Sequence, residues 1–286
     1  RAPPRLVEAV HDAAKRGTTS RPGHPVTIDA AAGSVIPDGA TRRRAFHLAD
    51  EDILIGGEAN EAALLRVIGA ARERLIIHST FVGKPAFARL KPHLVEAARK
   101  GARVELMWGE NDDPRSAGRT RTVVAAIREE LAASGEDELI RLNPFSTRSH
   151  AKFVVADRGG GAPVALIGSC NWLSSGMALL EAGVRLQEPR LVADILYLAA
   201  ELSRGRDGHW NELTSQLAAY AASVSNMPPM RGSNAEAAIL LGPTHRDILR
   251  QACDKAERRV LLLGHRVSAS ARQAFLIPAR TALIAR

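Results

Sequence analysis

Between residues 52 and 142 the chain alternates short apolar runs with longer segments whose apolar side chains recur at helical spacing. This alternation constrains the fold more than any other feature of the sequence. Short apolar runs bounded by polar residues are typical of buried strands, and the segments between them are long enough to be helices. We expect strands at residues 74–78, 104–108 and 139–142, and helices at residues 59–72, 87–100 and 120–133. Strands separated by helices predict an α/β fold with a mixed, largely parallel sheet that helices flank.

The next part of the chain departs from this alternation. Two apolar runs, residues 151–156 and 164–167, are separated by a segment that contains three consecutive glycines, residues 159–161. Glycines between two strands with no helix after them predict a hairpin turn rather than a phosphate-binding loop. Further helices are expected at residues 190–202 and 210–222.

Composition excludes several classes of protein. The chain has 286 residues, of which 45% are hydrophobic and 24% are charged, and these values exclude disordered, collagen-like and disulfide-stapled chains. No apolar run approaches the roughly 18–20 residues of a membrane span, and no signal peptide is expected. Two cysteines, Cys170 and Cys253, predict neither a disulfide framework nor a zinc site, so a cytoplasmic location is favoured.

The charge balance favours a polyanionic partner. Lys and Arg number 39 against 31 Asp and Glu, which gives a formal net charge of +8. Such an excess is typical of proteins that bind nucleic acid, although an Arg- and Ala-rich composition from codon bias gives the same excess. Aromatic residues make up only 4% of the chain, which argues against an aromatic platform for single strands.

One stretch concentrates polar residues of the kind that act on a phosphate. His150 and Lys152 are separated by one residue, so on a strand their side chains would point the same way, about 7 Å apart. Asp157 follows, and Ser169 and Asn171 stand at the end of the next expected strand. An imidazole, an ammonium, a hydroxyl and a carboxamide together suit a tetrahedral phosphate. No carboxylate cluster of the kind that binds magnesium stands nearby, so neither a metal nor another cofactor is expected.

This pattern, His-x-Lys-x4-Asp followed by Gly-Ser-x-Asn, resembles the signature of the phospholipase D superfamily. Residues 75–106 are similar to the family's opening strand, helix and strand, and the resemblance covers residues 52–187 well and residues 237–286 in part. Ten residues separate Asp157 from Gly168, where the family commonly has six. We expect the extra residues to lengthen the hairpin without moving the strand ends.

The resemblance implies a role for each of these residues. His150 matches the histidine that attacks phosphorus or protonates the leaving group, and Lys152 matches the phosphate-binding lysine. Ser169 and Asn171 match the pair that contacts the phosphate. Asp157 matches the third signature residue, which more often orients than reacts; an ordinary turn residue is the alternative.

Further residues near the motif have weaker predictions. Glu181 stands where family members often have a carboxylate that holds the far nitrogen of the histidine, but the Asn that usually precedes it is missing here. His78 lies at a strand end near the expected cleft, where a minor contact with substrate and no catalytic part are both open. Arg148, just before the motif, either contacts a phosphate or is simply exposed to solvent. Cys170 is expected to be buried and inert, and Trp172 to be a packing residue.

The chain also contains a partial internal repeat. At a constant offset of 186 residues, Leu75 aligns with Leu261 and Pro92 with Pro278, without a gap. Chance alignment of two ordinary α/β segments is the alternative. We therefore expect an N-terminal extension or linker at residues 1–50, a first lobe at residues 51–226, a linker at residues 227–236 and the start of a truncated second lobe at residues 237–286.

The family's active site brings two His-Lys-Asp motifs face to face, whereas this sequence contains one. The resemblance implies that the second motif comes from C-terminal sequence beyond residue 286 or from the partner in a homodimer. A degenerate second half is a third alternative. On the first account the 286-residue piece by itself is expected to be inactive or weakly active.

The leading hypothesis is a metal-independent phosphodiesterase, a nuclease of a bacterial kind that cleaves DNA or RNA through a phosphohistidine intermediate. One alternative is a phospholipase or phosphatidyltransferase, although members similar to cardiolipin synthase usually carry N-terminal membrane helices that this chain does not show. Another is a catalytically incomplete module that grips nucleic acid through its phosphate pocket. The sequence does not distinguish DNA from RNA.

Overall fold

The computed structural model of the chain describes residues 43–109, 118–178, 181–205, 208–239, 244–255, 276–277 and 280–281. The described residues fall into two compact units, one running from Arg43 to Ala237 and the other from Ala238 onward. All the predicted site residues belong to the first unit. None of the helices in the described ranges is both long enough and apolar enough to cross a membrane.

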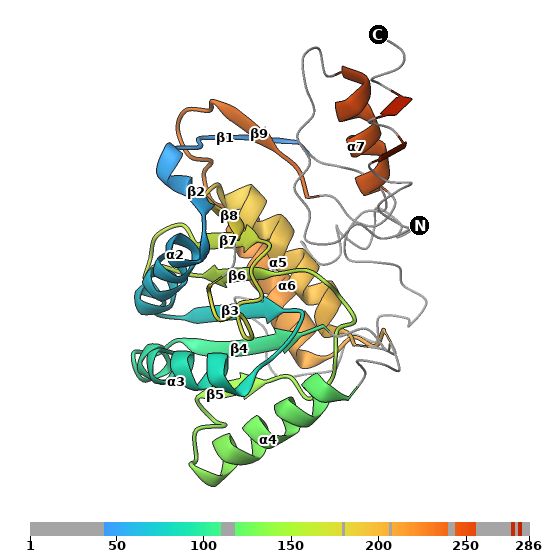
Figure 1. Cartoon of the computed structure of the whole chain (residues 1–286). Coiled ribbons are helices and arrows are strands. Elements are labelled where there is room, and N and C mark those ends of the chain that lie inside the picture. Colours follow the sequence, from blue (N-terminus) through green and yellow to red (C-terminus); the bar gives the residue numbers. More distant parts are fainter. Residues whose placement is uncertain are drawn as a thin grey trace. The chain divides into compact units, whose positions relative to one another are not determined.

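The first unit is built on a seven-stranded sheet with the order β2-β8-β7-β6-β3-β4-β5, seen in Figure 1. Its strands are β2 (Ile53–Ile55), β3 (Arg74–Ser79), β4 (Arg103–Trp108), β5 (Ile140–Leu142), β6 (Phe153–Ala156), β7 (Val164–Gly168) and β8 (Ala182–Leu186). The predicted α/β class with a mixed sheet is confirmed.

The sheet is less parallel than the sequence predicted. Only β3, β4 and β5 run parallel to one another, and the other four pairings among the described strands of this sheet are antiparallel. For β6 and β7 the physical reason is the short connection: the glycine-containing turn folds the chain straight back, and a parallel pairing would need a much longer crossover.

Helices cover both faces of this sheet (Figure 1). On one face, α2 (Gly57–Ala70), α3 (Lys84–Arg99) and α4 (Arg119–Ala133) bury their apolar side chains against those of the strands in one continuous core. On the other face, α5 (Pro189–Ser203) and α6 (Glu212–Ser225) pack against each other, and α5 contacts β6 and β7. Every helix and strand expected between residues 59 and 142 is present, with ends within about three residues of the prediction.

The structure adds strands that the sequence analysis did not predict. β8 is one of them, and a separate two-stranded ribbon pairs β1 (Arg44–Phe46) with β9 (Ala235–Ala237). These strands are short, and the residues of β8 alternate neither in polarity nor clearly in burial, so no period-two pattern marks them. Conversely, the strand expected at residues 151–156 begins only at Phe153.

In the second unit, α7 (Thr244–Lys255) occupies the place that the 186-residue offset gives to a counterpart of α2. The counterparts of β3 and of Pro92, around Leu261 and Pro278, lie outside the described residues. The internal repeat and the division into lobes therefore remain predictions.

Candidate active site

Most of the predicted site residues lie at one end of the sheet. His150 and Lys152 come just before β6, and because β6 runs antiparallel to β3, they lie beside the point where β3 ends. β7 ends at Gly168, whose backbone N–H donates to the Lys152 carbonyl over 3.4 Å. Ser169 follows directly, and Glu181 stands just before β8, the strand that pairs with β7. The pairings of β3 with β6, β6 with β7 and β7 with β8 thus bring these four side chains to one edge of the sheet, where β3 and β7 end.

The Lys152 ammonium is buried and fully engaged at this edge. Its Nζ donates to the Thr80 hydroxyl (2.8 Å), to the His150 carbonyl (2.8 Å) and to Nδ1 of the His150 ring (3.0 Å). Only 8% of Lys152 is exposed, and burial lowers its pKa to about 8, although the charge of Glu181 opposes the shift. The sequence predicted that Lys152 and His150 point the same way, and their side chains do meet, although both residues precede the strand.

His150 presents its ring to solvent beside this fixed cation. The residue is exposed, and the edge of its ring lies against Phe81, with the ring centroids 6.4 Å apart. Partial burial and the nearby Lys152 charge lower the pKa of His150 below its ordinary value, so the ring is held toward its neutral form. A neutral imidazole retains a lone pair, which is what a nucleophile or a proton acceptor needs.

Ser169 and Glu181 form a second polar pair at the same edge. The Ser169 hydroxyl donates to the Glu181 carboxylate over 2.5 Å and accepts from the backbone N–H of Ala182 over 3.0 Å. Ser169 is exposed, whereas Glu181 is buried. Within the described residues, the contact of Glu181 is therefore with Ser169 and not with His150, the partner that the sequence analysis expected. The carboxylate orients a hydroxyl and acts on Lys152 through its charge.

Asn171 lies in the turn after β7, where its backbone carbonyl accepts hydrogen bonds from the N–H groups of Ser174 and Ser175. Its side-chain Oδ1 is buried and has no partner among the described residues. The predicted contact of Asn171 with phosphate remains a prediction.

Asp157 is not brought to this edge. It follows β6 at the opposite end of the strand, where its Oδ1 accepts from the backbone N–H groups of Arg72, Glu73 and Arg74 at 2.8–3.1 Å. Its Oδ2 accepts from the N–H of Gly159. Burial by itself would raise the pKa of Asp157, but these four backbone donors outweigh it and lower the pKa. The carboxylate thus fixes the start of β3 and the glycine turn.

Two residues where β3 ends, His78 and Thr80, hold the segment before β6, and of these the sequence analysis considered only His78. His78 is fully buried, with Nδ1 2.8 Å from the Ala151 carbonyl oxygen and Nε2 2.7 Å from the Thr147 hydroxyl. Thr80 is 1% exposed and donates to the His150 carbonyl over 3.2 Å. These contacts span about 70 residues of sequence, so no local pattern signals them.

Of the remaining residues with weaker predictions, two are packed in the core and one lies in the segment before the motif. Cys170 and Trp172 are fully buried, and burial raises the pKa of the Cys170 thiol to about 12, as expected for an inert cysteine. Arg148 is exposed and adopts a φ of 57°, a left-handed conformation that side chains other than glycine seldom take. Its predicted phosphate contact remains a prediction.

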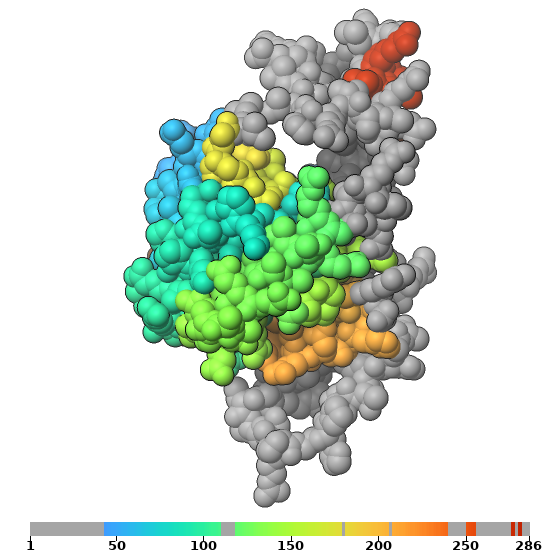
Figure 2. Space-filling view, turned by 60° about the horizontal axis from the view of Figure 1, so that its bottom comes forward, coloured from blue at the N-terminus to red at the C-terminus, as the bar shows by residue number. Residues whose placement is uncertain are grey.

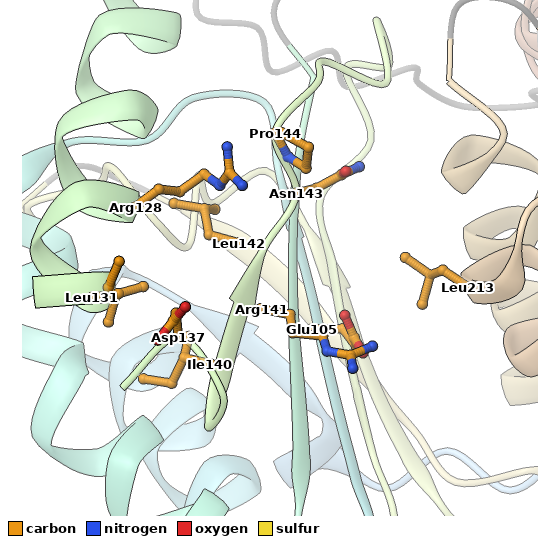
Figure 3. A pocket seen from close by; sticks show the side chains of 11 residues that line it. Glu105, Arg128, Leu131, Asp137, Ile140, Arg141, Leu142, Asn143, Pro144 and Leu213 are labelled. Carbon is orange, nitrogen blue, oxygen red and sulfur yellow. The ribbon is translucent and has the colours of Figure 1, made fainter. Parts of the chain in front are cut away.

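A cavity of about 360 Å³ lies elsewhere in the same unit, along the edge strand β5. Figure 3 shows side chains from α4 on one side of this strand, among them Arg128, with Glu105, Arg141 and Leu213 on the other side. In the space-filling view of Figure 2, the green residues of α4 and β5 adjoin the orange residues of α6. None of the predicted site residues lines this cavity, so it is separate from the site at the end of β3.

The side chains gathered at this site suit an anionic ligand. An exposed imidazole, a buried ammonium and an exposed, oriented hydroxyl stand together, and all three can contact an anionic tetrahedral group. In the part of the chain that the structure describes, no three His, Cys, Asp or Glu side chains gather in a way that could hold a metal ion. Lys152 brings a positive charge to this site.

Residues 64–200, which include all the predicted site residues, match the family model "Cardiolipin synthase, PLD-like domain". No curated protein matches the chain. Among solved structures, the chain is similar to Nuc of Salmonella typhimurium, a phospholipase D family member, with 21% identity, a TM-score of 0.37 and coverage of 51% of this chain and 91% of that one. NucT from Helicobacter pylori is 14% identical, with a TM-score of 0.34 and coverage of 56% of this chain and 95% of that one. Phosphatidylserine synthase from Haemophilus influenzae Rd KW20 is 11% identical, with a TM-score of 0.42. The match covers 70% of this chain and 49% of that one, so this chain spans about half of that protein.

Proposed function

The chain contains a domain of the phospholipase D superfamily, and we propose that this domain supplies one half of the active site of a phosphodiesterase that cleaves nucleic acid. The observation that carries the proposal is the contact between the buried Lys152 ammonium and the ring of the exposed His150. A phosphodiester carries one negative charge, so a cation fixed beside a nucleophile both binds the group and compensates the charge that moves during displacement.

In the proposed reaction a nitrogen of the His150 imidazole attacks phosphorus. A P–N bond forms while the P–O bond to the leaving group breaks, and the leaving oxygen takes a proton from a second imidazole opposite the attack. Water then attacks the phosphohistidine and gives a proton to that second imidazole, and the P–N bond breaks. Lys152 holds a phosphoryl oxygen throughout, and Ser169 is placed to donate to another.

One imidazole does not suffice for both halves of this cycle. The nucleophile and the leaving oxygen stand in line on opposite sides of phosphorus, so a single ring cannot attack one side and protonate the other. The sequence contains one His-x-Lys pair, His150 and Lys152. We infer that the second imidazole comes from a second copy of the chain or from another part of the polypeptide.

Net charge supports nucleic acid as the substrate. The chain has a formal net charge of +8, and a basic protein attracts and retains a polyanion through counterion release. A phospholipid diester offers the same reacting group, and the matching family model bears the name of a phospholipid enzyme. The substrate experiment therefore includes both classes.

The test incubates the full-length protein with plasmid DNA, single-stranded DNA, RNA and phosphatidylglycerol vesicles, each in excess EDTA. His150→Ala removes the proposed nucleophile, and His93→Ala, at an exposed position on α3, is the matched control. The proposal predicts nucleic acid cleavage in EDTA that His150→Ala abolishes and His93→Ala retains. Cleavage of the vesicles but not of nucleic acid would refute nucleic acid as the substrate in favour of a phospholipid. Cleavage that persists in His150→Ala would refute the assignment of the site.

A further inference from the structure

Thr80 occupies an unusual place at the end of β3. It is 1% exposed, and its hydroxyl is engaged in both directions. The Oγ1 atom accepts a hydrogen bond from Lys152 Nζ over 2.8 Å and donates one to the His150 carbonyl over 3.2 Å. The hydroxyl of the residue that follows β3 is therefore inserted between the Lys152 side chain and the backbone of His150.

In this arrangement each N–H donor of the Lys152 ammonium has a partner. An ammonium group has three N–H donors and no acceptor. The three partners of Lys152 are the Thr80 hydroxyl, the His150 carbonyl and Nδ1 of His150, at 2.8, 2.8 and 3.0 Å. Because the ammonium can only donate, Nδ1 has to be the acceptor, and the proton of the neutral His150 ring then lies on Nε2.

We propose that Thr80 is a positioning residue, whose hydroxyl holds the Lys152 ammonium against Nδ1 of His150 in the substrate-free protein. Two of the three acceptors of Lys152, Thr80 and the His150 carbonyl, belong to the packed scaffold. The ring of His150 is exposed and can move, so an incoming phosphoryl oxygen takes the place of Nδ1 on the ammonium. Substrate binding thereby frees the lone pair of Nδ1 from its hydrogen bond to Lys152. The catalytic consequence rests on the proposed function, whereas the placement of the lysine and the ring proton does not.

The hydroxyl can be removed with little change in shape. Thr80→Val keeps the branched side chain and loses the hydrogen bonds, and Thr80→Ser keeps the hydroxyl. Thr122→Val is the matched control, because Thr122 is an exposed threonine on α4 whose hydroxyl donates to a backbone carbonyl. Thermal denaturation identifies any variant that fails to fold.

The first readout is the ring-nitrogen NMR spectrum of His150 without substrate. We expect the Nε2–H tautomer in the wild type, Thr80→Ser and Thr122→Val, and a mixture of tautomers in Thr80→Val. The second is cleavage kinetics, where Thr80→Val should lower kcat at least about tenfold through misplaced groups and Thr80→Ser should restore it to within about threefold. An Nε2–H tautomer that survives in a folded Thr80→Val would overturn the proposal.

The spectrum distinguishes failure of this inference from failure of the proposed function. If no diester is cleaved, the ring spectra still decide whether Thr80 positions Lys152 and His150. If Thr80→Val does not fold, the wild type provides the test. A hydroxyl proton of Thr80 protected from solvent and close to the Lys152 side chain supports the proposal, and a rapidly exchanging hydroxyl refutes it.

Discussion

Acidification should destabilise the protein through His78. This residue is fully buried, and burial lowers its pKa from 6.5 to about 4; the Ala151 carbonyl opposes the shift and the Lys152 charge adds to it. In the neutral ring, Nδ1–H donates to Ala151 and Nε2 accepts from the Thr147 hydroxyl. Protonation at Nε2 turns this acceptor into a donor and places a second charge near Lys152.

The sign and size of the effect follow from proton linkage. The unfolded chain binds a proton at His78 near pH 6.5, whereas the native protein binds it near pH 4. The stability that His78 provides is therefore fully present above pH 6.5 and is lost as the pH falls toward 4. A difference of about 2.5 pKa units at about 1.36 kcal/mol each gives roughly 3 kcal/mol, a large share of the stability of an ordinary domain.

Urea denaturation over this pH range measures the effect. His78→Gln cannot take up the proton, and His93→Gln is the control for an exposed histidine. Protonation of other groups, such as Asp157, changes the free energy of unfolding of all three proteins equally and cancels in the comparison. We expect the free energy of unfolding of the wild type and His93→Gln to fall about 3 kcal/mol further than that of His78→Gln. Equal losses in all three would refute the reasoning.

Three further predictions concern other parts of the same unit. Asp157→Ala leaves four backbone N–H groups without their acceptor, so thermal and urea denaturation should report a loss of roughly 2–4 kcal/mol, while kcat per folded molecule is retained. A folded but inactive Asp157→Ala would restore a chemical role to this residue. Gly109→Ala puts a Cβ 2.0 Å from the Ser149 carbonyl oxygen, which displaces the segment before His150, so we expect at least about a tenfold loss of kcat with the fold retained by circular dichroism. Cys170 should resist thiol reagents in the native protein and react only on unfolding, and rapid native labelling would contradict its burial.

The helices and strands of the first part of the sheet were predictable because each one has its own local pattern. β3 and β4 read as apolar runs since both faces of these strands are covered, and α3 has the periodicity of a helix with one buried face. The hairpin of β6 and β7 was predictable from its glycines, whereas the topology after β7 was not. β8 has no alternation, and its pairing with β7 depends on the close approach of Gly168 and Gly183.

The candidate site was predictable in its motif and not in its contacts. The proximity of His150 and Lys152 follows from a spacing of two in an extended chain. The same geometry separates His150 from Asp157 by roughly 20 Å, because each residue of an extended strand advances about 3.3 Å. The partners of Lys152 and Glu181 could not be foreseen, since Thr80 and Ser169 reach them only once distant strands have paired.

The central claim, that His150 is a nucleophile toward phosphodiesters, can be tested without the second half of the site. In bis(p-nitrophenyl) phosphate the leaving p-nitrophenolate departs with its electron pair and needs no proton, so one imidazole can complete the first displacement. After a rapid alkaline quench, which preserves P–N bonds, we expect mass spectrometry to find the p-nitrophenyl phosphoryl group on His150, with release of one p-nitrophenolate per adduct. Release of p-nitrophenolate with no adduct on His150, or at an unchanged rate in His150→Ala, would contradict the account.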